Sequence, residues 1–353
     1  MASLERSSSE TSDKAVGRPA TASGIAVGRR AGVGLVIFLL VAFGVPTLLR
    51  CGTHPEYDPT AIDAINRDAP EFVFLGNSLL ETRIDPEYLS TLLAGRKAVS
   101  LAVPSTESAA WYLQLKNVVA ASDAPVRTVF IFFHKDMITR PLEGLDGRNR
   151  DVIAGLLSAD DADYSRVIEQ NRSVHDWMLA ALAGAYPLQN LNGAALDGMS
   201  ELAAFALPSS REQLSNLAED TFAAHNQREP GIELRPAEPV RPLDSSISSS
   251  FLPLMLDIAR ERGIKLVFVR VQERPNVDGS VRETLAMREY SRELADYLDA
   301  AGAGYVDFTG NASIDRAMYY DSFHIRQRYL TDYTDLFYRE MSAYFEDAGN
   351  MAR

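Results

Sequence analysis

The stretch "EFVFLGNSLLETRIDP" (residues 71–86) begins with an apolar run and changes character at Gly76 and Asn77, directly before a serine, Ser78. A short continuous apolar run bounded by turn residues is typical of a strand buried on both faces. A serine at the end of such a strand either caps the following helix or stands at the edge of a sheet as a nucleophile. The rest of the chain has to distinguish these two interpretations.

The same alternation of apolar runs and helical patterns continues along the chain. We expect strands at residues 72–76, 98–103, 127–133, 265–271 and 304–308, and helices at 85–95, 106–121, 248–262, 282–301 and 326–345. Strands that alternate with helices predict a parallel sheet between two helical layers, an α/β three-layer sandwich. Residues from about 141 to 247 show irregular helical patterns without a strand, which predicts a helical insertion.

Residues 31–49 form a segment without any charged side chain. At about 1.5 Å per residue, a helix of this length spans nearly the ~30 Å hydrocarbon core of a bilayer, so we predict one transmembrane anchor. The alternatives are a cleaved signal peptide and a lipoprotein cleaved before Cys51. A long preceding tail and the lack of a small-residue cleavage site argue against the first. Arg50, which stands where a small residue is needed, argues against the second.

Charge on either side of the anchor predicts its orientation. Only Arg50 follows it directly, whereas the basic residues before it are Arg6, Lys14, Arg18, Arg29 and Arg30. The positive-inside rule therefore predicts that residues 1–30 lie in the cytoplasm, that the anchor lies in the cytoplasmic (inner) membrane, and that the chain after it is exported to the periplasm. The composition of residues 1–30 predicts that this tail is disordered. There we expect a linker at 50–70, a folded domain at 71–347 that contains the insertion, and a short tail at 348–353.

The composition excludes some classes of partner. A formal net charge of −13 at pH 7 argues against nucleic acid. The single cysteine, Cys51, excludes an internal disulfide and a multi-cysteine metal site, and we expect no metal or other cofactor.

A base for Ser78 has to come from one of five histidines. His324, in "YYDSFHI", is the one with a carboxylate, Asp321, three residues before it. A bend of that length can bring the carboxylate to Nδ1 and leave Nε2 for the serine. Because this segment follows the last predicted strand, it can return to the edge of the sheet where Ser78 stands. We therefore predict a site formed by Ser78, His324 and Asp321. The alternative is that Ser78 caps the following helix and that His324 is an ordinary surface histidine.

These two motifs resemble blocks of the SGNH (GDSL-like) hydrolase superfamily. "FLGNS" is similar to the first block, which ends in the nucleophilic serine, and "DSFH" is similar to the last, Asp-x-x-His. The resemblance covers roughly residues 72–345, apart from the insertion. It implies a flavodoxin-like sheet and acyl-ester chemistry through Ser78, His324 and Asp321.

Two blocks depart from the superfamily pattern. In the superfamily, a glycine of the second block donates its backbone N–H to the oxyanion. "LAVPSTES" (residues 101–108) lacks this glycine, so we expect the N–H of Ser105 or Thr106 to take its place. "FFHKDMITRP" (residues 132–141) lacks the usual asparagine, so His134 or Lys135 is the candidate there, unless one oxyanion donor is missing. His134 can equally be a residue of the core edge.

Four further residues are candidates for contacting substrate. They are Asn77, Lys135, Arg270 and Arg274. Asn77 can instead form the turn, and the two arginines can instead form ion pairs.

The predicted anchor, the departures and the run "VRVQERP" (residues 269–275) resemble the membrane-anchored SGNH-like proteins that accompany membrane-bound O-acyltransferases in polysaccharide acetylation. This resemblance implies an acyltransferase or esterase that acts on a cell-surface glycan, with an O-acyltransferase as partner. The alternative is a catalytically degenerate subunit that binds polysaccharide or serves as a scaffold.

Overall fold

A computed structural model describes residues 60–140, 147–158, 161–171, 240–281 and 283–350, all within one compact unit, Gly52–Arg353. The strands are β1 Phe72–Leu75, β2 Ala98–Ser100, β3 Thr128–Phe133, β4 Lys265–Arg270 and β5 Gly304–Asp307. The α-helices are α2 Thr60–Asp68, α3 Ser78–Glu81, α4 Pro86–Leu92, α5 Ser108–Gln114, α6 Gly147–Leu156, α7 Ala162–Asn171, α11 Leu243–Ile247, α12 Leu252–Arg262, α13 Leu285–Ala300, α14 Leu330–Glu340 and α15 Ser342–Asn350.

The five strands form one parallel sheet in the order β2-β1-β3-β4-β5. This order places the chain reversal between β1 and β3, the point at which doubly wound sheets of this type bind ligands beyond their carboxyl ends. The predicted parallel α/β fold is confirmed, and the end of β1 is where a site is expected.

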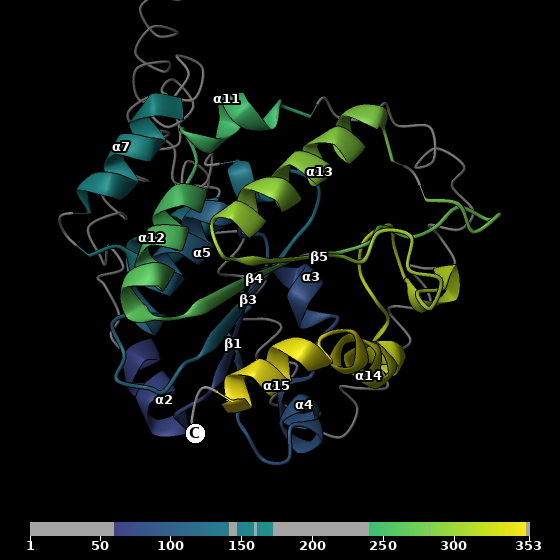
Figure 1. Cartoon of the computed structure of the whole chain (residues 1–353), viewed down its shortest axis with the longest axis horizontal. Coiled ribbons are helices and arrows are strands. Elements are labelled where there is room, and N and C mark those ends of the chain that lie inside the picture. Colours follow the sequence, from purple (N-terminus) through teal and green to yellow (C-terminus); the bar gives the residue numbers. More distant parts are fainter. Residues whose placement is uncertain (1–59, 141–146, 159–160, 172–239, 282, 351–353) are drawn as a thin grey trace, which may run out of the picture. The chain divides into compact units, whose positions relative to one another are not determined.

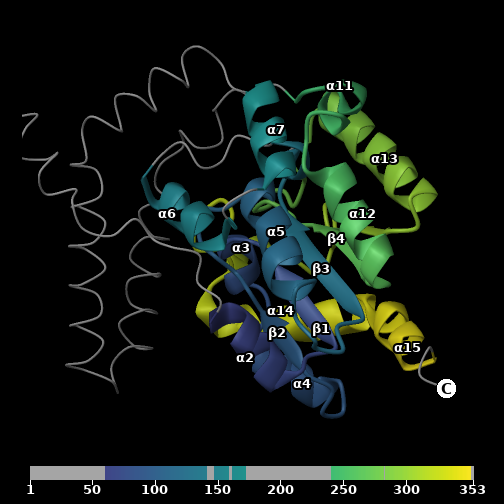
Figure 2. The ribbon, with the colours of Figure 1, turned by 90° about the vertical axis from the view of Figure 1, so that its left-hand side faces the viewer.

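Two hydrophobic clusters cover the two faces of the sheet. Alternate side chains of each strand point to opposite faces, so Val73 and Leu75 join a cluster with α5, α12 and α13, while Phe72 and Phe74 join one with α3, α4 and α14. Figures 1 and 2 show α5, α12 and α13 on one side of the sheet and α4, α14 and α15 on the other. The arrangement is the predicted three-layer sandwich.

Several predicted boundaries are corrected by the hydrogen bonds. The second strand ends at Ser100, although the N–H groups of Leu101 and Val103 still donate to Phe74 O of β1 and to Gly76 O just after it. The helix expected at 106–121 is α5 followed by a π-helical turn, Leu115–Val119, where Ala120 N–H donates to Leu115 O. The helix expected at 326–345 begins with a 3₁₀ turn, Gln327–Tyr329, and breaks at Met341 between α14 and α15.

The remaining predictions concern parts of the chain that are only partly described. Helices α6 and α7 lie between β3 and β4, in the predicted insertion, while 172–239 lie outside the described residues. The predicted anchor at 31–49 lies outside them too. Among the helices that are described, none has the length and apolar character needed to cross a membrane.

Candidate active site

A tight turn between β1 and α3 presents Ser78. A Cβ on Gly76 would lie 2.8 Å from the Leu80 Cβ and 3.2 Å from the Phe132 Cβ, so only glycine fits this close approach without a shift of its neighbours. Asn77, not Ser78, caps the helix: its Oδ1 accepts a hydrogen bond from Leu79 N–H at 3.0 Å. The capping role is thus filled by Asn77, and Ser78 is left half-buried at the first helical position.

The loop between β5 and α14 carries His324. The two ends of this loop are joined by an isolated antiparallel β-bridge between Tyr319 and Ile325. Within it, Asp321 Oδ1 accepts from the N–H groups of Phe323 and His324, each at 2.7 Å. This turn leaves Oδ2 of Asp321 to contact His324 Nδ1 at 2.7 Å. The predicted bend is confirmed, and it is held by the same carboxylate that orients the ring.

Ser78 and His324 meet although 246 residues separate them. Ser78 Oγ lies 2.8 Å from His324 Nε2, and both side chains remain partly exposed. Burial by itself would raise the pKa of Asp321, but hydrogen bonds from the His324 ring and backbone outweigh it and lower that pKa. Asp321 is therefore ionised at neutral pH and can orient the imidazole. The ring of Tyr320 stacks on that of His324, at 5.5 Å between centroids and 16° between planes.

Three backbone N–H groups near the serine are candidates for stabilising an oxyanion. Those of Ser78, Ser105 and Thr106 donate to no backbone carbonyl among the described residues. Asn77 Nδ2 donates to Thr106 O at 3.0 Å, which brings this segment beside the serine turn. Ser105 has φ +63°, a left-handed conformation that glycine adopts without strain. Ser105 therefore has a backbone conformation that is more usual for glycine.

His134 and Lys135 both contact one carboxylate, Glu273. Its Oε1 lies 2.8 Å from His134 Nε2 and 3.0 Å from Lys135 Nζ. Burial would raise the pKa of Glu273, but these two partners lower it to about 2. Burial also lowers the pKa of His134, so its ring is neutral with the proton on Nε2, facing the carboxylate. Without a second N–H, a neutral His134 cannot donate to an oxyanion, which argues against its predicted role.

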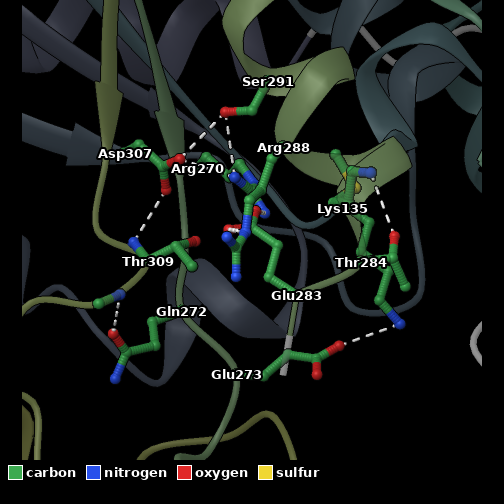
Figure 3. A network of polar contacts seen from close by, with 12 residues as sticks. Lys135, Arg270, Gln272, Glu273, Glu283, Thr284, Arg288, Ser291, Asp307 and Thr309 are labelled. Atoms are coloured by element: carbon green, nitrogen blue, oxygen red, sulfur yellow. Dashed lines mark hydrogen bonds and ion pairs between the residues drawn. The ribbon is translucent and has the colours of Figure 1, made fainter. Parts of the chain in front are cut away.

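Arg270 lies in a buried ion-pair cluster, shown in Figure 3, and only 4% of it is exposed. Its guanidinium contacts Asp307 at 2.6 Å, Glu283 at 2.5 Å and the Ser291 hydroxyl at 3.1 Å. The ion-pair alternative therefore applies, and the prediction that Arg270 contacts substrate is wrong, because its donors face protein groups.

Besides Arg270 and Lys135, the substrate candidates were Asn77 and Arg274. Both ends of the Asn77 amide are engaged within the protein, as described above, so Asn77 is a turn and cap residue. Arg274 donates its backbone N–H to Ser322 O at 3.0 Å, which places its backbone against the loop that carries His324.

Sequence reasoning missed two residues at this edge of the sheet, Arg83 and Glu273. Arg83 is fully buried and hydrogen-bonded to both sides of the site. Glu273 lies in the run at 269–275, but nothing in that run marks it as the partner of His134 and Lys135. Arg83 has one local partner, Leu79 O, whereas its other two carbonyls are distant in sequence, so no local signal could have identified its role. Among the described residues no group of three or more His, Cys, Asp and Glu side chains is placed to hold a metal ion.

Comparison with known proteins gives distant structural neighbours, of which three are described below. No family model and no curated protein matches the chain. A proposed acylhydrolase from Bacteroides fragilis has 10% identity and a TM-score of 0.37, over 82% of this chain and 100% of its own. A protein described as platelet activating factor from Streptococcus pneumoniae has 10% identity and a TM-score of 0.37, over 90% and 99%. A proposed arylesterase from Agrobacterium tumefaciens has 12% identity and a TM-score of 0.31, over 77% and 99%.

All three neighbours combine identities of 10–12% with TM-scores of 0.37 or less. Their TM-scores are too low to support a functional argument. The chemistry of the site therefore has to be inferred from the contacts among Ser78, His324 and Asp321 themselves.

Proposed function

We propose that this protein is an SGNH-type serine esterase or O-acyltransferase with Ser78, His324 and Asp321 as its catalytic triad. The observation that carries the proposal is the continuous chain of contacts from Ser78 Oγ to His324 Nε2, at 2.8 Å, and from His324 Nδ1 to Asp321 Oδ2, at 2.7 Å. A serine is a weak nucleophile until a base takes its proton, and the base needs a third group to orient it. These three residues meet both requirements.

In the proposed reaction, Ser78 Oγ attacks the carbonyl carbon of an ester while His324 Nε2 takes the hydroxyl proton. The imidazolium then gives this proton to the leaving oxygen as the carbon–oxygen bond breaks, which leaves an acyl group on Ser78. A second hydroxyl, from water or a sugar, loses its proton to His324 and attacks the acyl carbon, which restores the serine.

Negative charge on the carbonyl oxygen is stabilised in this proposal by backbone N–H groups. Ser78 N–H is in the first turn of α3, where helix geometry provides no internal acceptor. The N–H of Ser105 or that of Thr106 supplies the second donor. Loss of one oxyanion donor costs about 3–4 kcal/mol of transition-state stabilisation, so two donors matter for the rate.

The proposed substrate is an acyl ester of a cell-surface glycan, acted on outside the cytoplasm. Support comes from the uncharged segment at 31–49, the basic residues before it and the resemblance to proteins that accompany membrane-bound O-acyltransferases. An O-acyltransferase of this kind is the proposed partner, since it would deliver the acyl group across the membrane. A reporter fused after Arg353 tests the location: activity of a cytoplasm-only reporter would contradict it.

The enzymatic proposal is tested with the full-length protein by hydrolysis of an activated acetyl ester, together with polysaccharide acylation in cells. Ser78→Ala should abolish both, whereas Ser165→Ala, which changes an exposed serine of α7, should leave both unchanged. Full activity of Ser78→Ala in both assays would end the proposal. Silence in the ester assay with loss of cellular acylation would identify a dedicated transferase.

The second candidate is a non-catalytic subunit that binds the glycan or serves as a scaffold. One observation favours it: Nε2 of His134, the residue after β3, is engaged by Glu273, so His134 does not replace the oxyanion asparagine that is usual in the superfamily. This candidate predicts that Ser78→Ala still supports acylation in cells, while deletion of the protein does not.

A further inference from the structure

Arg83 is a charged residue with no exposed surface, directly behind the proposed nucleophile. It follows α3 by two residues, and 0% of its surface is exposed. Among the described residues no carboxylate forms an ion pair with it; instead its guanidinium carbon lies 5.5 Å from the Tyr333 ring centroid and 5.9 Å from that of Tyr319. Its Nε is buried without a hydrogen-bond partner.

Such a residue is costly for the fold. A guanidinium remains protonated in proteins, and removing an ion from water costs several kcal/mol even after relaxation. Replacement of buried charges by apolar side chains of similar size is often neutral or stabilising. Stability alone therefore does not account for an arginine here, and the groups that it contacts have to be considered.

The guanidinium donates to three backbone carbonyls from three separate segments. Nη1 donates to Leu79 O at 3.0 Å, and Nη2 donates to Phe323 O at 2.7 Å and Gln272 O at 3.2 Å. Leu79 follows Ser78, and Phe323 precedes His324. Gln272 precedes Glu273, which holds His134 and Lys135. One planar group thus joins the residues next to the nucleophile, the base and the neighbouring ion pairs.

We infer that Arg83 is a positioning residue that sets the distance between Ser78 and His324 through the carbonyls of their neighbours. This inference rests on the proposed function, because it concerns the geometry of the same triad. The flat fork of arginine donates in several fixed directions at once, whereas the ammonium of lysine is a point charge. Without the fork, the two carbonyls lose their shared donor, and the loop that carries His324 is free to shift relative to α3.

The experiment measures the rate at which a serine-directed phosphonate labels the full-length protein, in Arg83→Lys and Arg83→Met. Both variants should label about 100-fold more slowly at saturating probe, because a displacement of about 1 Å costs roughly that factor. The probe concentration for half-maximal rate should change by less than about threefold, since Arg83 contacts no substrate. Arg96→Lys is the matched control: Arg96 also donates to a carbonyl, that of Phe345, and lies over the Phe72 ring, but at the opposite end of the strands.

A second readout separates positioning from general stability. In an Asp321→Asn background the imidazole is already misoriented, so Arg83→Lys should reduce labelling by less than about fivefold further. If Arg83→Lys acted only on stability, it would lower the labelling rate by the same factor in the Asp321→Asn background as in the wild type. Circular dichroism shows whether each variant is folded at the assay temperature.

The outcomes are distinct. Wild-type labelling by either folded variant would overturn the inference, and so would full additivity with Asp321→Asn. Loss of the fold in both variants would assign Arg83 to stability and overturn it too. If Ser78→Ala itself labels like the wild type, the proposed function fails. If only Ser78→Ala is silent and the Arg83 variants are normal, the function stands and the inference about Arg83 falls.

Discussion

Two polar clusters lie at the carboxyl ends of the strands, and they differ in what remains exposed. In the first, the side chains of His324 and Asp321 are 22% and 26% exposed, and Ser78 is half-buried. In the second, the Arg270 side chain is 5% exposed and contacts two carboxylates and a hydroxyl. The first cluster is accessible to a substrate, whereas in the second both terminal nitrogens of Arg270 are engaged by protein groups and its Nε is buried.

The comparison shows that residue type does not decide the role of a polar cluster. Arg270 and Ser78 both follow or end a buried strand, and both were candidates for the site. Burial would lower the pKa of Arg270, but Asp307 and Glu283 raise it, which is the pattern of a paired structural charge. Two substitutions, one in each cluster, make this contrast measurable.

The largest effect is expected from His324→Ala. Removal of the base should reduce phosphonate labelling of Ser78 by about 1000-fold or more, because the hydroxyl is then not activated. Thermal unfolding should change little, since the side chain is partly exposed. A large loss of stability with labelling intact would reverse the assignment of the two clusters.

The opposite result is expected from Arg270→Met. This change leaves Asp307 and Glu283 without their shared partner, so the free energy of unfolding should fall by about 3–5 kcal/mol in denaturant titrations. The fraction that remains folded should label at close to the wild-type rate. Arg260→Met, at an exposed ion pair, is the matched control and should cost less than about 1 kcal/mol.

A smaller effect with a defined pH dependence is expected at Glu273. Its pKa is about 2 in the folded protein, against an ordinary value of 4.5, so it stabilises the fold above pH 4.5 and loses this contribution as pH falls toward 2. The loss should be on the order of 2 kcal/mol, allowing for partial exposure. Denaturant titrations of Glu273→Gln should show a weaker dependence across this window. An unchanged dependence would show that Glu273 is not paired in solution.

The smallest effect is expected from Ser105→Gly. Relief of the left-handed strain and the added flexibility of glycine oppose each other, so stability should change by less than about 1 kcal/mol. Labelling should persist, because the proposed oxyanion donor is a backbone N–H. Loss of labelling in Ser105→Gly would show that the Ser105 side chain, and not only its backbone N–H, contributes to the reaction.

Sequence predicts the fold well here because most of its information is local. The runs at 72–76 and 127–133 locate β1 and β3 to within one residue at each end, since both are apolar and bounded by turn residues. The contacts of the proposed triad are also predictable, because Asp321 and His324 lie on one turn and Ser78 follows closely after β1. The predictions for Arg270 and His134 failed because they depend on contacts between distant parts of the chain. Arg270 is paired with Asp307 and Glu283, and His134 contacts Glu273.

Arg83 illustrates the limit most clearly. In "LETRIDP" it stands among polar residues and reads as a surface arginine. Its burial depends on carbonyls 189 and 240 residues away in the chain, at Gln272 and Phe323. Because two of its three partner carbonyls are so distant, its role leaves no pattern in its own neighbourhood and becomes visible only in the folded chain.

The most direct test of the central claim is to locate the phosphonate adduct on the full-length protein by peptide mass spectrometry. We expect a single adduct on the peptide that contains Ser78, and its loss in His324→Ala, because Ser78 Oγ depends on the imidazole 2.8 Å away. An adduct on another serine, or one on Ser78 that forms equally fast in His324→Ala, would contradict the assignment of Ser78, His324 and Asp321 as a catalytic triad.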